Sequence, residues 1–75
     1  MHRLRVLRNS GGVTEVTLLA ALRQGTNLPV DVATSLARAV VVPPAHIDWA
    51  SDSDFPVEQV ADVLIEQGFE VGFDA

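Results

Sequence analysis

Two apolar segments with helical spacing meet at a joint made only of Thr26, Asn27 and Leu28. The first segment ends at Gly25, the residue type that most often follows the end of a helix. Pro29 fits the first position of a second helix, where its missing N–H needs no partner. In the second segment, apolar residues recur at helical spacing at Val30, Ala33, Leu36, Ala37 and Val40. So short a joint predicts two short helices folded back into a hairpin.

The chain that must bury this hairpin is small. It has 75 residues, of which 48% are hydrophobic, and it contains no cysteine. A domain of this size buries only about 60% of its unfolded surface, so one compact core must supply its stability. We therefore expect a single domain over residues 1–75, with neither disulfides nor a thiolate metal site.

The charge balance excludes several kinds of partner. The net charge is −5, and all five basic residues are arginines, so the chain lacks the lysine and arginine clusters that bind nucleic acid. An anionic membrane is unattractive for the same reason. No apolar segment approaches the roughly 20 residues that span a bilayer. The N-terminal residues also lack the apolar region of a signal peptide. We expect a cytoplasmic protein that binds neither nucleic acid nor membrane.

Three segments alternate apolar and polar side chains, as half-buried strands do: residues 3–7, 45–49 and 69–73. Their apolar face would carry Leu4, Val6, Ile47, Trp49, Phe69, Val71 and Phe73. The opposite face would carry Arg3, Arg5, His46, Asp48 and Glu70. Arginines opposite acidic residues on neighbouring strands predict cross-strand ion pairs on that face.

The first helix is expected to start after Thr14, a good N-cap, and to run to about Gln24. Its apolar residues are too many for one stripe. If Val16, Leu19 and Leu22 face the sheet, then Leu18, Ala20 and Ala21 cannot all be buried. In the second helix, Val32 is expected to face outward if Val30, Ala33, Leu36 and Ala37 face inward.

A third helix follows a polar turn. Ser53 or Asp54 can cap this helix, and Pro56 lies in its first turn. Gly68 is expected to end it. The predicted buried face consists of Val57, Val60, Ala61, Leu64 and Ile65. The element order β-α-α-β-α-β predicts an α+β two-layer sandwich, in which the helices pack on one face of a three-stranded antiparallel sheet.

This order and the helix joint resemble the C-terminal domain of the bacterial ribosomal stalk protein. Residues 18–23 and 26–36 fall in step with that family's hairpin motifs without a gap. Pro44 and Ile47 match its next motif, and its last motif is matched by Val57, Val60, Leu64, Gly68 and Val71. The resemblance implies the same fold. It also implies a partner surface, because that family recruits translational GTPases through an exposed hairpin face.

The matching hairpin face has a different composition here. Ala20, Asp31 and Thr34 stand where the family has lysines, whereas Arg23 is retained. The face is therefore neutral to apolar, and we expect a non-catalytic protein-interaction module rather than a basic docking surface. Apolar burial would supply most of the affinity, and Arg23 would set the orientation. The predicted contact residues are Leu18, Ala20, Arg23, Asn27, Pro29 and Val32.

Two alternatives use the same chain differently. A homodimer could form through the same hairpin face, because adjacent exposed apolar residues also favour self-association. The chain is also similar to the N-degron adaptor of the Clp protease, at the spacing of Asn9 and Thr14 and at Ala33 and Thr34. That resemblance implies a pocket in which the asparagine holds a free α-amino group. Ser10 stands where that family has an acidic residue.

Other site chemistry finds little support in the sequence. His2 and His46 have no nucleophile predicted beside them, so we expect no enzyme. Asp48, Asp52 and Asp54 suggest a calcium loop, but Phe55 and Pro56 interrupt the required ligand spacing. We therefore expect neither a metal site nor a cofactor.

Overall fold

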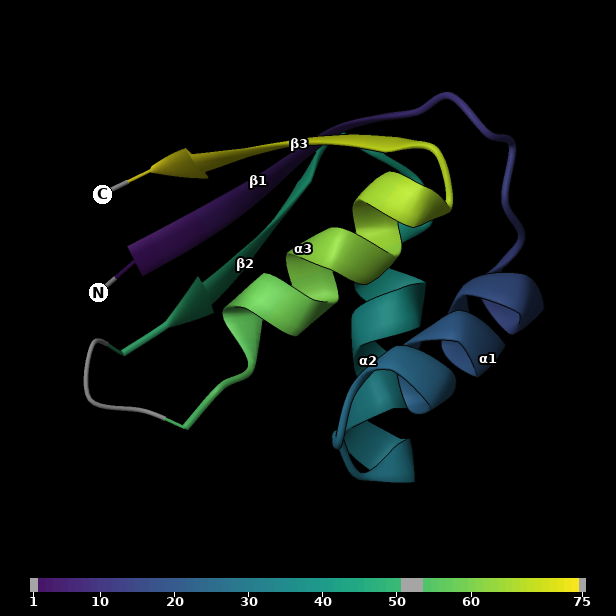
Figure 1. Cartoon of the computed structure of the whole chain (residues 1–75). Helices are drawn as coiled ribbons and strands as arrows, with labels where there is room; N and C mark the ends of the chain where they lie inside the picture. The colour runs from purple at the N-terminus through teal and green to yellow at the C-terminus, as the bar shows by residue number, and fades with distance from the viewer. Residues whose placement is uncertain (1, 51–53, 75) are drawn as a thin grey trace.

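The computed structural model describes residues 2–50 and 54–74 and has the predicted α+β architecture (Figure 1). The elements in chain order are β1 (His2–Asn9), α1 (Glu15–Gly25), α2 (Val30–Val40), β2 (Ala45–Trp49), α3 (Val57–Glu66) and β3 (Phe69–Asp74). The three strands form one sheet in the order β2-β1-β3, with both neighbouring pairs antiparallel. The three helices cover one face of this sheet, and the core lies between the two layers.

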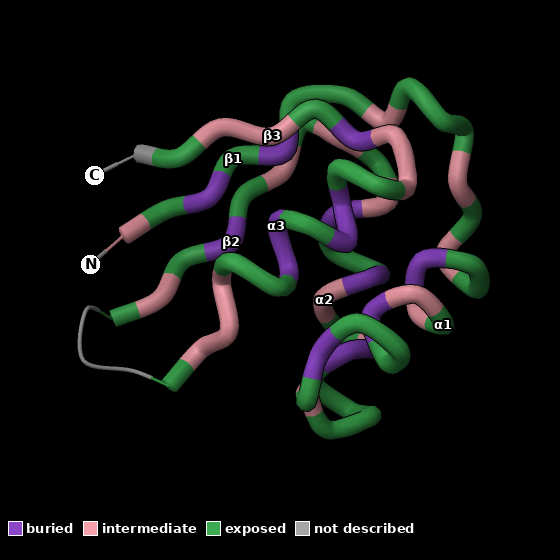
Figure 2. The backbone as a smooth tube through the Cα atoms, viewed as in Figure 1, coloured by how far each residue is buried: buried purple, intermediate pink, exposed green. Residues whose placement is uncertain are grey.

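The strands alternate as their sequences predict. Leu4 and Val6 of β1 are fully buried, whereas Arg3 and Arg5 are exposed on the open face of the sheet. Leu4 lies opposite Ile47 on one side and Phe73 on the other, so the apolar positions of the three strands share one face. Figure 2 shows these buried positions along the strands and on the helix surfaces that meet them.

The pairing of β1 with β3 shifts by one residue after Val6, so that Arg8 lies opposite Glu70 and Asn9 opposite Phe69. Such a bulge moves the following residue to the other face of the sheet. Arg8 is accordingly exposed on the open face beside Glu70, while Asn9 turns towards the helices. Leu7, which follows the buried Val6, is 52% exposed. The Asn9 amide group donates hydrogen bonds to the carbonyl oxygens of Val13 (3.0 Å) and Val41 (3.1 Å) and accepts one from the Val13 N–H (3.1 Å).

Helix α1 begins as predicted but is rotated relative to the expected face. The Thr14 hydroxyl accepts a hydrogen bond from the Thr17 N–H, which confirms the N-cap. Leu18 and Leu22 are fully buried, whereas Val16 is 78% exposed. The prediction that Val16 faces the sheet is therefore wrong. Apolar residues occur on almost every side of this helix, so their spacing alone does not identify the buried side.

Gly25 is not a left-handed cap, because among the described glycines only Gly12 and Gly68 have positive φ. It is the last residue of α1, and Thr26 occupies the cap position instead. Gly25 lies against α3, where a β-carbon added to it would overlap the Cγ2 methyl group of Val63. The glycine is required there by close helix packing, not by backbone conformation.

Helix α2 ends before the proline pair, as predicted, and Pro29 lies at its N-cap, one residue before the expected position. Ala33, Ala37 and Val40 are fully buried. Val32 is exposed as expected, but Val30, expected to face inward, is 55% exposed. Val30 is the first residue of the helix.

Helix α3 differs from expectation at its start and in its buried face. Pro56 occupies the N-cap without a side-chain hydrogen bond, so Asp54 does not cap the helix, and Ser53 lies outside the described residues. Val63 is buried in place of Ile65, which is 55% exposed. The helix turns this face inward because Val63 packs on Gly25 of α1.

Gly68 follows α3 with a φ of 93°, which confirms that it ends the helix. Its carbonyl oxygen accepts a hydrogen bond from the Gly11 N–H at 3.2 Å, so the turn after β1 rests on the turn after α3. A β-carbon on Gly11 would overlap the backbone carbonyl of Gln67. Gly11 is therefore the second position at which close packing requires a glycine, because two turns cross there.

The helices do not cover the end of the sheet where both termini lie (Figure 1). Phe73 lies on the helix-facing side, as predicted, yet it is 58% exposed. It meets the half-buried Trp49 edge-on, with a ring-centroid distance of 6.4 Å, and Phe55 stacks on the same indole at 6.0 Å. Alternation correctly predicted the face of the sheet on which Phe73 lies. It did not predict that the helices leave this end of the sheet uncovered.

Candidate partner-binding surface

The hairpin is held together at both ends. Thr26 in the joint is buried, and its hydroxyl donates to the Leu22 carbonyl oxygen at 2.6 Å and accepts from the Leu28 N–H at 3.3 Å. At the other end, Arg38 of α2 lies 3.9 Å from the carboxylate of Glu15 in α1. The two helices pack against each other between these contacts. Any surface on the hairpin is therefore carried by two helices that pack on each other.

Five of the six predicted contact residues are exposed on this hairpin. They are Ala20, Arg23, Asn27, Pro29 and Val32. Ala20 and Arg23 are three residues apart and share one side of α1. Asn27 and Pro29 lie in the joint that follows the helix. Ala20 and Arg23 also line a shallow depression together with Gln24.

Leu18, the sixth predicted contact residue, is fully buried in the core and cannot belong to this surface. Its assignment followed from placing Val16 inward, and the rotation of α1 exchanges the two residues. Val16 lies four residues before Ala20 and extends the same exposed stripe, which therefore comprises Val16, Ala20 and Arg23. The spacing of Val16 from Ala20 and Arg23 was the signal that could have identified it.

Arg23 is the only charged member of this stripe. Its side chain forms no ion pair or hydrogen bond with any other residue that the structure describes. By contrast, Arg38 on α2 contacts Glu15. No described residue engages the Arg23 side chain, so its guanidinium group is available to contact another molecule.

Two arginines on the open sheet face pair with acidic residues of neighbouring strands, as predicted. Arg3 donates from Nε to Asp48 Oδ1 at 2.8 Å and from Nη2 to Oδ2 at 3.4 Å. Arg8 Nε lies 3.3 Å from a carboxylate oxygen of Glu70. Within β2, His46 Nε2 lies 3.5 Å from Asp48 Oδ2. The hydrogen bond from Arg3, together with the positive charges of Arg3 and His46, lowers the pKa of Asp48. These side chains stabilise the register of the sheet.

Within residues 2–50 and 54–74, no group of three histidine, cysteine or acidic side chains is placed to hold a metal ion. Asp52, part of the weighed calcium loop, lies outside those residues. Asn9 and Thr14, the residues that resemble the N-degron adaptor, both make hydrogen bonds inside the fold. Asn9 bridges Val13 and Val41, and Thr14 caps α1.

None of the helices in the described part of the chain has the length and apolar character that crossing a bilayer requires. Comparison with protein-family models, with curated proteins and with solved structures finds no match to this chain. The resemblance to the ribosomal stalk domain therefore stays a prediction from the sequence motifs, and the function must be inferred from the surface itself.

Proposed function

We propose that this protein is a non-catalytic interaction module that binds a protein partner through the outer face of its α1–α2 hairpin, as the resemblance to the ribosomal stalk C-terminal domain implies. The observation that carries the proposal is the exposed stripe of Val16, Ala20 and Arg23 on α1, with the exposed Asn27 and Pro29 in the joint beside it. The centre of a protein interface is depleted of charged residues but enriched in arginine, and this stripe carries one arginine and no other charge.

The apolar area on the hairpin supplies a driving force for association. Val16 is 78% exposed, and Val30 and Val32, at the start of α2, are exposed as well. Burying a fully exposed valine side chain contributes up to about 1.5 kcal/mol. Single exposed apolar residues are normal, but several on two adjacent helices favour a contact with another protein.

Arg23 gives this surface its orientation. A guanidinium group offers planar, paired donors that match a carboxylate or two carbonyl oxygens. With no partner among the described residues, Arg23 can donate to a group on the bound protein. The expected partner site is therefore apolar, with an acidic or carbonyl-rich edge that meets Arg23.

A photo-crosslinking experiment tests the proposal. A photoreactive phenylalanine analogue replaces Ala20 in one protein and Ala50 in another; both alanines are exposed, and Ala50 lies next to the end of β2, away from the hairpin. In the native lysate, we expect a crosslinked protein from position 20 that is absent from position 50. Crosslinks only to a second copy of the chain would support the homodimer instead. Equal products from both positions would overturn the proposal.

A further inference from the structure

A depression on the open face of the sheet is lined by basic side chains from two strands. It has a volume of about 450 Å³, and its lining consists of Arg3, Arg5, Pro44, Ala45 and His46. The two arginines come from β1 and the histidine from β2, and all three are exposed. Among the described residues, no acidic side chain is part of this lining. The depression is therefore a place where positive charge converges.

The strand register brings two of these basic side chains together. Arg5 lies directly opposite His46 in the antiparallel pairing of β1 with β2, so their β-carbons are about 5 Å apart. On its other side Arg5 lies opposite Gly72 of β3, where an added β-carbon would meet no atom within 4 Å. An arginine directly opposite a protonated histidine is repelled by it, whereas an anion between them attracts both. The register thus creates a position that favours negative charge.

Asp48 orients the basic groups beside Arg5. Its Oδ1 accepts a hydrogen bond from Arg3 Nε at 2.8 Å, and its Oδ2 lies 3.5 Å from His46 Nε2. Arg3 and Arg5 each make a further interaction within the chain. A guanidinium group has five N–H donors, however, so these contacts do not use all of them. Nδ1 is the second ring nitrogen of His46, and it donates as well when the ring is protonated.

We propose that this depression binds a single phosphate group, with Arg5 and His46 on two sides of it and Arg3 on a third. A phosphate group has three strong acceptor oxygens and more negative charge than a carboxylate, which suits donors that arrive from three side chains. A carboxylate is planar and is matched by one guanidinium fork, as Asp48 is by Arg3.

The net charge of the chain limits the kind of molecule that carries this phosphate. At −5, it opposes a polyanion such as nucleic acid, so the ligand presents an isolated phosphate group, on a small molecule or on a phosphorylated side chain. The open face of the sheet lies opposite the helix layer that includes the hairpin (Figure 1). The phosphate site therefore stands or fails independently of the proposed function.

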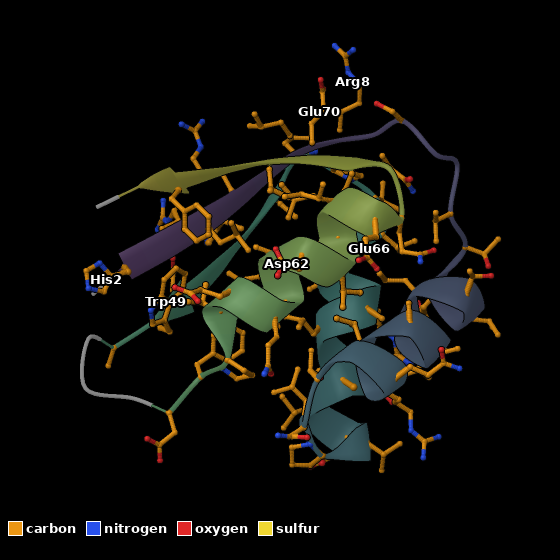
Figure 3. All side chains as sticks on the ribbon, viewed as in Figure 1. His2, Arg8, Trp49, Asp62, Glu66 and Glu70 are labelled. Carbon is orange, nitrogen blue, oxygen red and sulfur yellow. The ribbon has the colours of Figure 1, made fainter. Side chains whose placement is uncertain are left out.

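Arg8 provides a matched control on the same face. It lies opposite Glu70, with its Nε 3.3 Å from a carboxylate oxygen, and it is not part of the depression. Figure 3 shows these two side chains together on the side of the sheet away from the helices. Arg5→Gln and Arg8→Gln change the net charge equally, but only the first alters the lining of the depression.

Amide NMR of the intact chain tests the site by titration with inorganic phosphate and, at the same ionic strength, with acetate. We expect phosphate to shift the signals of residues 3–5 and 45–47 until they saturate, and to bind at least tenfold more tightly than acetate. Arg5→Gln should weaken phosphate binding about tenfold and Arg8→Gln less than twofold. Equal affinity for acetate, equal weakening by both variants, or unmoved signals at these residues would overturn the proposal.

A substitution at Gly72 adds an internal competitor for the phosphate. Gly72→Asp places a carboxylate opposite Arg5, where the structure has room for it, and Gly72→Asn adds the same shape without the charge. The aspartate is expected to weaken phosphate binding at least tenfold and the asparagine less than threefold; equal effects would contradict the site.

A phosphopeptide identifies the source of the phosphate group. The probe is acetyl-Gly-Gly-phosphoserine-Gly-Gly-amide, compared with inorganic phosphate in the same titration. Binding of the peptide at least tenfold more tightly supports a phosphorylated protein as the ligand, and equal or weaker binding supports a small phosphorylated molecule. Shifts caused equally by the unphosphorylated peptide would overturn recognition of phosphate.

Discussion

Gly25, the last residue of α1, lies so close to Val63 of α3 that a β-carbon on the glycine would overlap the Cγ2 methyl group of the valine. Val63 is buried, and a valine side chain has little freedom to rotate away. The pair therefore sets how closely the hairpin approaches α3. It also fixes which side of α3 faces inward.

This contact predicts a change of sign. Gly25→Ala is expected to destabilise the protein by about 1–2 kcal/mol, because overpacking exceeds the better helix propensity of alanine. In a Val63→Ala background the obstruction is gone, so the same substitution should stabilise by up to about 0.5 kcal/mol. Urea unfolding of the four proteins in this double-mutant cycle measures both effects. The same sign in both backgrounds would contradict the close packing.

Asn9 is expected to be the most sensitive polar residue of the fold. Asn9→Ala removes three hydrogen bonds to the backbone of Val13 and Val41, and it should cost about 2–3 kcal/mol because these groups lose partners. Asn27→Ala is the control, since this asparagine is exposed in the joint and should change stability by less than about 0.5 kcal/mol. Thermal unfolding distinguishes them, and similar losses would refute the bridging role.

Leu18 and Ala20 are two positions apart on α1, but their substitutions should differ strongly in their effect on stability. Leu18→Ala is expected to cost about 2–5 kcal/mol, because it leaves a cavity in the core. Ala20→Glu should alter the free energy of unfolding by less than about 0.5 kcal/mol, since its side chain is exposed. Denaturant titration of both variants checks the rotation of the helix. A large loss from Ala20→Glu would mean that this residue is not on the surface.

The ion pair of Arg3 with Asp48 predicts a pH dependence. Because the folded-state pKa of Asp48 is lowered, its contribution to stability is present above the unfolded value, about 3.9, and is lost as the pH falls through the folded value. Asp48→Asn should therefore lower the urea midpoint at pH 7 more than at about pH 2. Asp31→Asn, at an exposed residue with no ion pair among described residues, is the control. An Asp48→Asn effect that does not diminish with falling pH would contradict the interaction.

The sequence predicted the element order, the strand faces and the Thr14 cap because these depend on local patterns. Alternation fixed the inward positions of Leu4 and Val6, and helical spacing fixed those of Ala33 and Ala37. The same patterns predicted that arginines would face acidic residues on neighbouring strands, as Arg3 faces Asp48. Local patterns are sufficient to predict the buried side of a segment where its sequence allows only one such side.

The remaining features depend on contacts between elements. The apolar residues of α1 allow several buried stripes, so the choice of Leu18 over Val16 needed the neighbouring helices. Val63 replaces Ile65 in the core because of Gly25, 38 positions away in the chain (63 − 25). The bulge that turns Asn9 inward likewise follows from pairing with β3. These choices determine which part of the candidate surface is exposed.

Affinity capture from the native lysate tests the central claim most directly, using the tagged wild-type protein beside Ala20→Glu and Ala50→Glu. The two variants make the same chemical change at exposed alanines, one on the hairpin stripe and one beside the end of β2. A protein retained by the wild type and Ala50→Glu but lost by Ala20→Glu is the expected result. The same set of proteins bound to all three would contradict the hairpin as the partner surface.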